Sequence, residues 1–219
     1  EAACAVLAEY YGRLLPDGGE ILDLMSSCVS HLPVEVDYHG VVGLGMNEVE
    51  LMTNPQLTSA LIADLNQNPT LPFADAAFDG CVISVSIQYL IQPIAIFSEI
   101  ARVLRPGAPC AVTFSNRMFP TKAIAVWRAL GDEDHARLVG YYFTEAGGFE
   151  EPVFEDISPF PGETDPLFSV LAGELKSSDM IFTLTGSASA LRRSATWRAS
   201  SSLMGPAAMG AQQTGADMS

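Results

Sequence analysis

The chain has 219 residues, of which 48% are hydrophobic and 17% charged, and its formal net charge is -15. This size and composition fit one globular domain with extensions, large enough to bury a substantial core. The acidic balance argues against a nucleic-acid partner and against an anionic membrane surface, because both require clustered Lys and Arg. Since no apolar run reaches the roughly 18 residues needed to cross a bilayer, no membrane span is expected.

The cysteine and histidine residues show no pattern of a metal site or a disulfide framework. The four cysteines contain no C-x-x-C pair, and the three histidines stand apart from them and from each other. Cys81 and Cys110 lie in apolar runs and are expected to be buried free thiols. We therefore expect no metal, and a reducing compartment such as the cytoplasm or an organelle stroma or matrix.

The first part of the chain alternates apolar strands with helical or polar segments. Residues 2–15 carry apolar groups at helical spacing, and the turn sequence Pro-Asp-Gly-Gly over 16–19 ends this helix. A short helix is expected over 47–54, with Asn47 as its N-cap. The strands expected in this part are 20–25, 39–46 and 59–66.

The second part of the chain continues the alternation. A Pro-containing connection over 71–80 leads into a strand over 81–90. Pro93 opens an amphipathic helix over 93–104, which the sequence Arg-Pro-Gly over 105–107 ends. The remaining expected elements are a strand over 109–116, a helical stretch from 120 to about 147, and strands over 151–158 and 166–175.

Strands that alternate with helical segments predict β-α-β units and a mainly parallel sheet. The expected fold is a doubly wound α/β domain with a seven-stranded, mainly parallel sheet, helices on both faces and a hairpin made by the last strands. The expected organisation is an N-terminal helix over 1–19, the α/β domain over 20–176 and a tail over 177–219. This tail is rich in Ser, Ala and Gly and is expected to be disordered.

Small polar side chains follow each of the first five strands. In an open α/β sheet, ligands bind at the carboxyl ends of the strands, near the switch in strand order. A nucleoside-sized ligand laid across the sheet is therefore expected, although each side chain alone is typical of an ordinary turn or helix cap. The residues are Asp23, Ser26, Ser27, Asn47, Asp64, Asn66, Ser84, Ser86, Ser115 and Asn116.

Two motifs resemble those of the class I S-adenosylmethionine-dependent methyltransferases. The sequence "LPFADAAFDG" over 71–80 is similar to the family's L-P-F-x-D-x-x-F-D, and Glu99 with "RVLRPG" over 102–107 is similar to E-x-x-R-V-L-(R/K)-P-G-G. Their order and spacing match, the resemblance covers roughly residues 20 to 175, and it is closest to the small-molecule "type 11" group. It implies a Rossmann-like methyltransferase fold, S-adenosylmethionine as cofactor and a small-molecule acceptor.

The first cofactor motif departs from this family. The family's D-x-G-x-G aligns with Asp23, Met25 and Ser27, so both glycines are absent. The family also places an acid at the end of the second strand for the ribose hydroxyls, and Gly45 stands there instead. Neighbouring hydroxyls could hold the methionine carboxylate, and a nearby amide could reach the ribose. The residues that offer these groups are Ser26, Ser27 and Asn47.

The resemblance also implies roles for individual residues. Asp23 would orient the methionine amino group, and Asp64 would accept a hydrogen bond from the adenine amine. Leu65 would pack near the adenine ring, while Ser84 and Val85 would flank the sulfonium. The alternative is that Asp23 and Asp64 only cap helices that follow them. The cofactor residues expected are Asp23, Met25, Ser26, Ser27, Asn47, Asp64, Leu65, Ser84 and Val85.

On the acceptor side, the chemistry demands little from the protein beyond position. Methyl transfer is an in-line displacement, and a general base is needed only if the acceptor must lose a proton. No catalytic residue is assigned; Tyr89 and Asn116 are expected to contact the acceptor. Gln88 is a further candidate, whereas Arg117 has the alternative of a solvated charge and His135 is expected to be an exposed helix residue.

Two other functions fit parts of the sequence. A non-catalytic binding or assembly protein of the same fold would explain the loss of the two glycines and the ribose acid. A nicotinamide-dependent dehydrogenase is disfavoured, because no G-x-G-x-x-G follows the first strand and no acid ends the second. The leading expectation is S-adenosylmethionine-dependent methyl transfer to a small molecule.

Overall fold

The strands form one seven-stranded sheet in the order β3-β2-β1-β4-β5-β7-β6. The first five strands in this order are parallel to one another, and β7 runs antiparallel to both β5 and β6. The computed structural model describes residues 2–175, so the expected tail over 177–219 lies outside the described residues. The strands are β1 (Glu20–Leu24), β2 (Gly40–Gly45), β3 (Ser59–Ile62), β4 (Gly80–Ser84), β5 (Pro109–Ser115), β6 (Val153–Asp156) and β7 (Leu167–Gly173).

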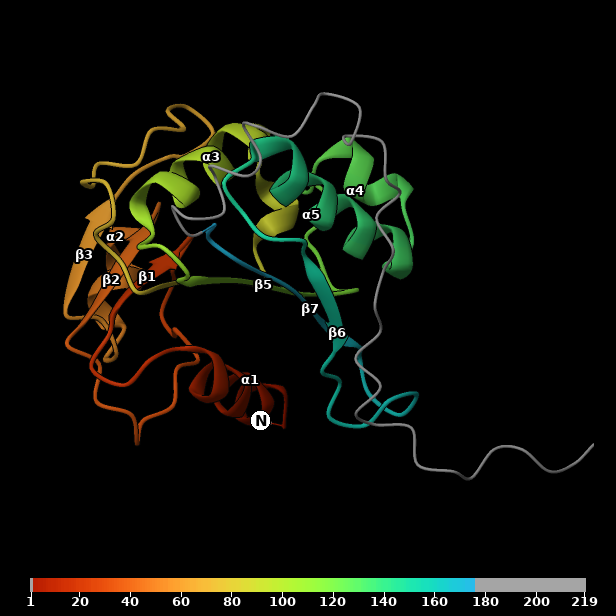
Figure 1. Cartoon of the computed structure of the whole chain (residues 1–219). Helices are drawn as coiled ribbons and strands as arrows, with labels where there is room; N and C mark the ends of the chain where they lie inside the picture. Colours follow the sequence, from red (N-terminus) through yellow and green to blue (C-terminus); the bar gives the residue numbers. More distant parts are fainter. Residues whose placement is uncertain (1, 176–219) are drawn as a thin grey trace, which may run out of the picture.

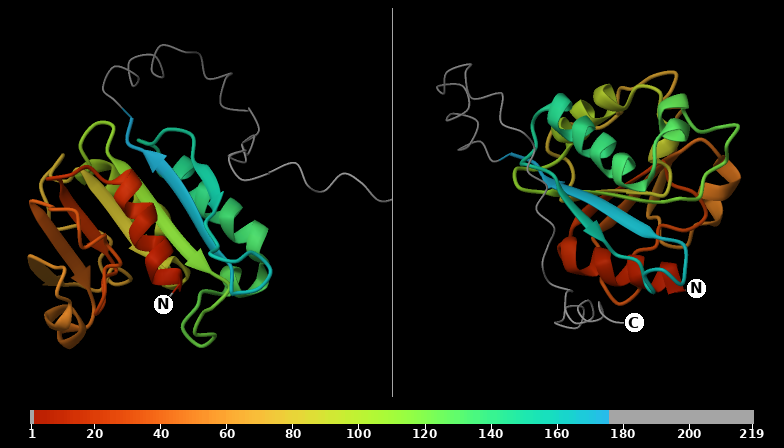
Figure 2. Two further views of the ribbon diagram at one scale, coloured as in Figure 1. Left: turned by 90° about the horizontal axis from the view of Figure 1, so that it is seen from below. Right: turned by 90° about the vertical axis from the view of Figure 1, so that its right-hand side faces the viewer.

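Helices lie on both faces of this sheet, which confirms the expected doubly wound α/β architecture (Figures 1 and 2). The N-terminal helix α1 packs on one face, and α3, α4 and α5 lie on the opposite face. The helices are α1 (Ala2–Leu14), α2 (Glu48–Thr53), the 3₁₀ helix η1 (Ile87–Tyr89), α3 (Pro93–Val103), α4 (Ala125–Ala129) and α5 (Asp132–Ala146).

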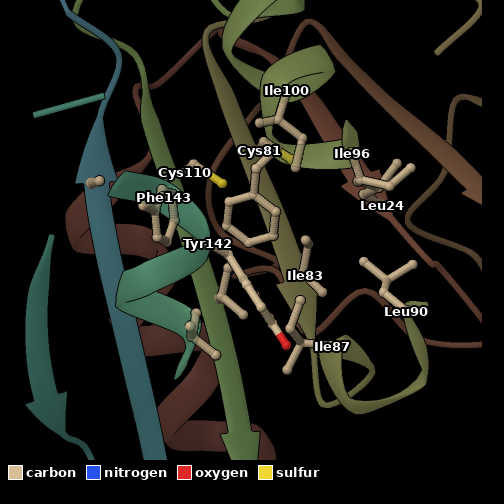
Figure 3. Close-up of a cluster of buried hydrophobic side chains, with 14 of the residues drawn as sticks. Leu24, Cys81, Ile83, Ile87, Leu90, Ile96, Ile100, Cys110, Tyr142 and Phe143 are labelled. Atoms are coloured by element: carbon tan, nitrogen blue, oxygen red, sulfur yellow. The ribbon is translucent and has the colours of Figure 1, made fainter. Parts of the chain in front are cut away.

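The larger core fills the space between the sheet and helices α3 and α5 (Figure 3). The ring of Phe97 meets Phe143 edge to face, with centroids 4.7 Å apart. Cys81 and Cys110 are register neighbours on β4 and β5, and both are buried free thiols, as the apolar runs around them predicted. The central strands therefore read as almost continuous apolar runs because both of their faces are covered.

The smaller core lies under α1. The helix buries Leu7, Tyr10 and Tyr11 against β1, β4 and β5. The buried Tyr11 hydroxyl lies 2.7 Å from Ser84 Oγ and 2.9 Å from Thr113 Oγ1, and its burial raises its pKa above the ordinary value. These two bonds satisfy the only polar atom of a buried ring and link the helix to the end of β4.

The two sequence motifs of the resemblance fold against each other. Arg102 on α3 donates to Glu99 and Asp75 and to the carbonyl oxygens of Leu71 and Phe73. The Arg102 guanidinium accordingly holds the pKa of Glu99 below its usual value. These contacts fix the connection between β3 and β4, so the motifs shape the sheet edge rather than supply side chains to a site.

Several expected boundaries were wrong, each for a local reason. The third strand ends at Ile62, because Asp64 begins a hydrogen-bonded turn. The fourth ends at Ser84, because Val85 adopts a positive φ of 47°. The helical stretch from 120 to about 147 is divided, because the chain is extended at Leu130 and restarts in α5 after Gly131.

Candidate functional site

Two adjoining cavities open at the carboxyl ends of the parallel strands, beside the switch in strand order between β1 and β4. The large cavity has a volume of about 670 Å³ and the small cavity about 230 Å³. The larger volume lies within the range of about 300 to 1,000 Å³ that is usual for small-molecule sites. The residues that line both cavities are Met25, Ser26, Ser27, Ser84 and Val85.

The structure brings the expected cofactor residues together around these two cavities. Asp23 lines the small cavity, and Asn116 is exposed and lines neither of the two. The remaining expected residues line the large cavity: Met25, Ser26, Ser27, Asn47, Asp64, Leu65, Ser84, Val85 and Tyr89.

Asp23 is a buried carboxyl group at the carboxyl end of β1, with 2% of its surface exposed. Its Oδ2 accepts a hydrogen bond of 2.5 Å from Ser26 Oγ. Burial raises the pKa of Asp23 from 3.8 to about 6, while the hydroxyls of Ser26 and Ser30 oppose the rise. Burial makes the charged form of this carboxyl group unfavourable. A cationic ligand group at the edge of the cavity would stabilise that charged form.

The segment after β1 follows β2 instead of turning into a helix. Met25 has a positive φ of 60°, and Ser26 N, two residues beyond the end of β1, donates to Leu44 O at 2.9 Å. Asn54 at the end of α2 then holds the segment, because its Nδ2 donates to Ser27 O and to Ser30 Oγ, both at 2.9 Å. The glycine-free loop is therefore built on a side chain from beyond β2.

Gly45 has no room for the acid that the resemblance places at the end of the second strand. A Cβ at this position would lie 2.3 Å from the carbonyl oxygen of Ser26. Glu50, in the first turn of α2, brings a carboxylate to the same cavity. Its Oε2 accepts from Ser27 Oγ at 2.5 Å and its Oε1 from Asn47 Nδ2 at 2.8 Å.

Sequence reasoning missed Glu50, although a signal for it was present. Asn47 is the N-cap of α2, as expected, and its Oδ1 accepts from the backbone N–H groups of Val49 and Glu50. A cap residue followed three positions later by Glu is the pattern of a capping box, in which the side chain of each residue reaches back to the backbone N–H of the other. That pattern alone would have placed the Glu50 carboxylate beside Asn47.

Asp64 closes a turn at the end of β3. Its Oδ1 accepts from Asn66 N at 2.9 Å and its Oδ2 from Gln67 Nε2 at 2.8 Å. Neither Asp64 nor Asp23 is followed by a helix, so the alternative that they cap helices was wrong. Both carboxyl groups close turns at the cavities instead, and each oxygen keeps a second lone pair for another donor.

The far wall of the large cavity comes from the segments after β4 and β5. Tyr89 Oη accepts a hydrogen bond of 3.0 Å from Phe119 N, so this tyrosine anchors a loop and also lines the cavity. Phe119 and Lys122 line the same wall, and sequence reasoning did not single them out. Since 30 residues separate Phe119 from Tyr89, no local pattern could have paired them.

The remaining acceptor-side candidates have structural roles. Arg117 pairs with Asp165, and the buried Gln88 donates from Nε2 to Val85 O at 2.9 Å. The expectation that His135 is exposed was wrong. It is 3% exposed and stacks on Trp127 with ring centroids 4.0 Å apart, while its Nε2 lies 2.8 Å from Trp127 O.

Two further features concern residues 2–175 as a group. No three His, Cys, Asp or Glu side chains in this range lie close enough together to hold a metal ion. Within the same range, no helix combines the length and the apolar character that crossing a bilayer requires.

Comparison with protein families finds a match to the methyltransferase domain over residues 40–112. The biotin biosynthesis bifunctional protein BioHC of Teredinibacter turnerae is 32% identical over 71 residues, which are 32% of this chain and 12% of that protein. This chain thus spans only a small part of that relative's length.

Solved structures of the same fold cover most of the chain. The [4+2]-cyclase SpnF has 16% identity and a TM-score of 0.59, with 80% of this chain and 82% of that chain covered. An S-adenosylmethionine-dependent methyltransferase from Mesorhizobium loti has 17% identity and a TM-score of 0.55, with 80% of this chain and 100% of that chain covered. At these identities, the likeness concerns the fold, which different activities share.

Residues 40–112 match the methyltransferase domain family, and residues 2–175 have the Rossmann-like fold that the motifs implied and that these solved structures share.

Proposed function

We propose that this chain binds S-adenosylmethionine across the two cavities and transfers its methyl group to a small molecule. One observation carries the proposal: three carboxyl groups line the cavities, at the ends of β1 and β3 and at the start of α2. The cofactor offers three hydrogen-bond donors, namely its ammonium group, its ribose diol and its adenine amine. The carboxyl groups are those of Asp23, Glu50 and Asp64.

In this proposal the small cavity holds the amino-acid end of the cofactor. Asp23 is buried there with only serine hydroxyls as partners, so an ammonium group would stabilise its charged form. Ser26 and Ser27 line both cavities; their hydroxyls donate to Asp23 and Glu50 in this structure and would have to rotate to donate to the cofactor carboxylate. The segment thus retains acceptor and donor groups without the two glycines.

The large cavity takes the nucleoside. Glu50 already accepts from Asn47 Nδ2 and from Ser27 Oγ, which fixes its carboxylate beside the position where the acid of the family is absent. Glu50 and Asn47 would accept from the ribose hydroxyls. Asp64 would accept from the adenine amine, and the buried Leu65 supplies an apolar surface next to the ring.

The bound cofactor supplies an electrophilic methyl group on a sulfonium. The chain's own contribution is alignment, because an in-line displacement is accelerated chiefly by holding the two reactants in position. Ser84 and Val85 stand between the two cavities, and Ser84 is fixed from below by the Tyr11 hydroxyl. The end of β4 is therefore a rigid floor for the reacting group.

A non-catalytic binding protein is the second candidate, and one observation favours it. The Ser26 carbonyl oxygen fills the space next to Gly45 that a ribose-binding side chain would otherwise use. A chain that gave up cofactor binding would be free to close this space with its own backbone.

Isothermal titration with S-adenosylhomocysteine separates the two. We expect binding that Glu50→Gln weakens roughly 10- to 100-fold, since hydrogen bonds to charged groups contribute about 1.5–3 kcal/mol. Glu48→Gln is the matched control, because this exposed acid of the same helix lines neither cavity. Absence of binding by the folded protein would favour the non-catalytic function. If binding is found, transfer of labelled methyl from S-adenosylmethionine to acceptors in an extract tests turnover.

A further inference from the structure

The wall of the large cavity that follows β5 differs in character from the wall that follows β2 and β3. Glu50 and Asp64 make the wall after β2 and β3 acidic. Phe119 and Lys122 give the wall after β5 an aromatic ring and a positive charge. In the sheet, β1 and β4 lie between these two groups of strand ends. A ligand that extends beyond the nucleoside end of the cavity therefore meets a different chemistry.

Lys122, like Arg13 and Arg128, forms no ion pair within residues 2–175, but among these three it alone lines the large cavity. The formal net charge of the chain is -15, and the arginines at 102, 105, 117 and 137 are all in ion pairs. The Lys122 Nζ lies 5.4 Å from the centroid of the Phe119 ring. An unpaired ammonium on a cavity wall of an acidic protein is a local attractor for an anion.

The segment that carries Lys122 is held in place by backbone bonds to η1. Phe119 N donates to Tyr89 Oη at 3.0 Å, and Ile124 N donates to Gln88 O at 3.0 Å. Within the turn, Lys122 N donates to Phe119 O at 2.9 Å. The lysine backbone is therefore fixed at the cavity, even though its side chain is exposed.

Phe119 presents an aromatic ring that is largely exposed to solvent. The residue is 65% exposed, and its ring lies 6.4 Å from the Tyr89 ring at an angle of 30°. An exposed Phe at the wall of a cavity stabilises a flat apolar group that packs on it, because the group removes its surface from water. Tyr89 supplies a second ring for the same group.

We propose that the methyl acceptor is a small, flat, aromatic molecule with an anionic group, either a carboxylate or a phosphate. Lys122 binds the anion, and the ring packs on Phe119 and Tyr89. This inference rests on the proposed function, because it puts the acceptor beside the proposed cofactor. Lys122 acts in binding and takes no part in the transfer itself.

The test uses three probes, 4-hydroxyphenylacetate, its neutral amide and phenyl phosphate, titrated calorimetrically with and without saturating S-adenosylhomocysteine. We expect the carboxylate or the phosphate to bind at least tenfold more tightly than the amide. Preference for one of the two anions identifies the anionic group of the acceptor. Equal affinity for the amide and both anions would overturn the proposal.

Lys122→Met removes the charge, and Arg128→Met is its matched control, an exposed cation six residues further on that lines neither cavity. The preference for anions should disappear in Lys122→Met and persist in Arg128→Met. Equal loss in both would point to net charge alone and overturn the proposal. So would weaker binding of S-adenosylhomocysteine by Lys122→Met, which would mean that the lysine holds the cofactor's own carboxylate.

The two proposals fail separately. A wild-type chain that binds no S-adenosylhomocysteine would contradict the proposed function. The titrations without S-adenosylhomocysteine would still measure whether anionic probes bind in a manner that depends on Lys122.

Discussion

Asp23 is the residue at which folding and ligand binding make opposite demands. Its pKa is raised by burial from 3.8 to about 6, so folding favours the protonated form. The contribution of the protonated Asp23 to the free energy of unfolding is fully present below pH 3.8, the ordinary pKa, and is lost as the pH rises through about 6. The difference between the two values corresponds to about 3 kcal/mol at neutral pH. Binding an ammonium group would recover part of this cost.

Replacement of Asp23 by Asn tests this conflict. The amide keeps an acceptor for Ser26 Oγ but carries no charge to bury. We expect Asp23→Asn to be more stable than the wild type by about 1–3 kcal/mol above pH 7, with the difference shrinking towards zero near pH 4. Urea unfolding between pH 4 and 8 measures it, with Glu48→Gln as the exposed control. A difference that does not change with pH would show that Asp23 is not the buried titrating group.

The segment over 25–39 is the element that decides whether the cavities keep their shape. It contains no helix, and its course depends on hydrogen bonds to residues that come later in the chain. Asn54 supplies two of these bonds, and Gln56 Nε2 adds a third to Leu32 O at 2.6 Å. The loop and the end of α2 therefore form one unit.

Asn54→Ala should detach the loop over 25–39 from the end of α2. Loss of its bonds leaves the buried Ser30 hydroxyl and the half-buried Ser27 carbonyl without this partner, at a cost of about 1–3 kcal/mol. We expect the same variant to weaken binding of S-adenosylhomocysteine at least tenfold. Asn68→Ala is the control, because this exposed asparagine only accepts from Thr70 N in a turn. Similar losses in both variants would contradict a special role for Asn54.

These elements also show what the sequence can and cannot predict. The central strands β1, β4 and β5 and helix α3 were predictable because burial on both faces, or on one helical face, leaves a local pattern. The course of the loop was not, since it depends on Asn54, a residue 27 positions from Ser27. His135 was misjudged because its burial depends on stacking with Trp127, which polarity at a helical position does not reveal. Phe119 was not predicted because its contact partner Tyr89 lies in another segment of the chain.

At the scale of the whole molecule, α1 is part of the fold and of the floor of the site. It covers one face of the sheet, opposite α3 and α5 (Figures 1 and 2). Through Tyr11 it also holds Ser84 at the wall shared by the two cavities. The described residues at the other end of the chain complete the sheet, since β7 pairs with both β5 and β6 and Leu175 N donates to Gly148 O at 2.9 Å.

We therefore propose that residues 2–175 contain everything the fold requires, and two truncations test this. A chain that ends at Leu175 should keep the melting temperature and the S-adenosylhomocysteine affinity of the full chain. A chain that begins at Asp17 should fail to fold, because removal of α1 uncovers Ile21 and Val82 and forfeits the burial of Leu7, Tyr10 and Tyr11. At about 1.5–3 kcal/mol for each large side chain, this loss is comparable to the 5–15 kcal/mol that usually stabilises a domain.

Circular dichroism with thermal melting measures both truncations, with about 2–4 °C expected for each kcal/mol in a domain of this size. A lower melting temperature for the chain ending at Leu175 would mean that residues after 175 contribute to the packed structure. A cooperative transition in the chain beginning at Asp17 would mean that α1 only covers a sheet that is stable without it. In that case Ser84 would lose its fixed position while the fold survived, and weaker binding of S-adenosylhomocysteine by that chain would then isolate the contribution of the Tyr11 contact to the site.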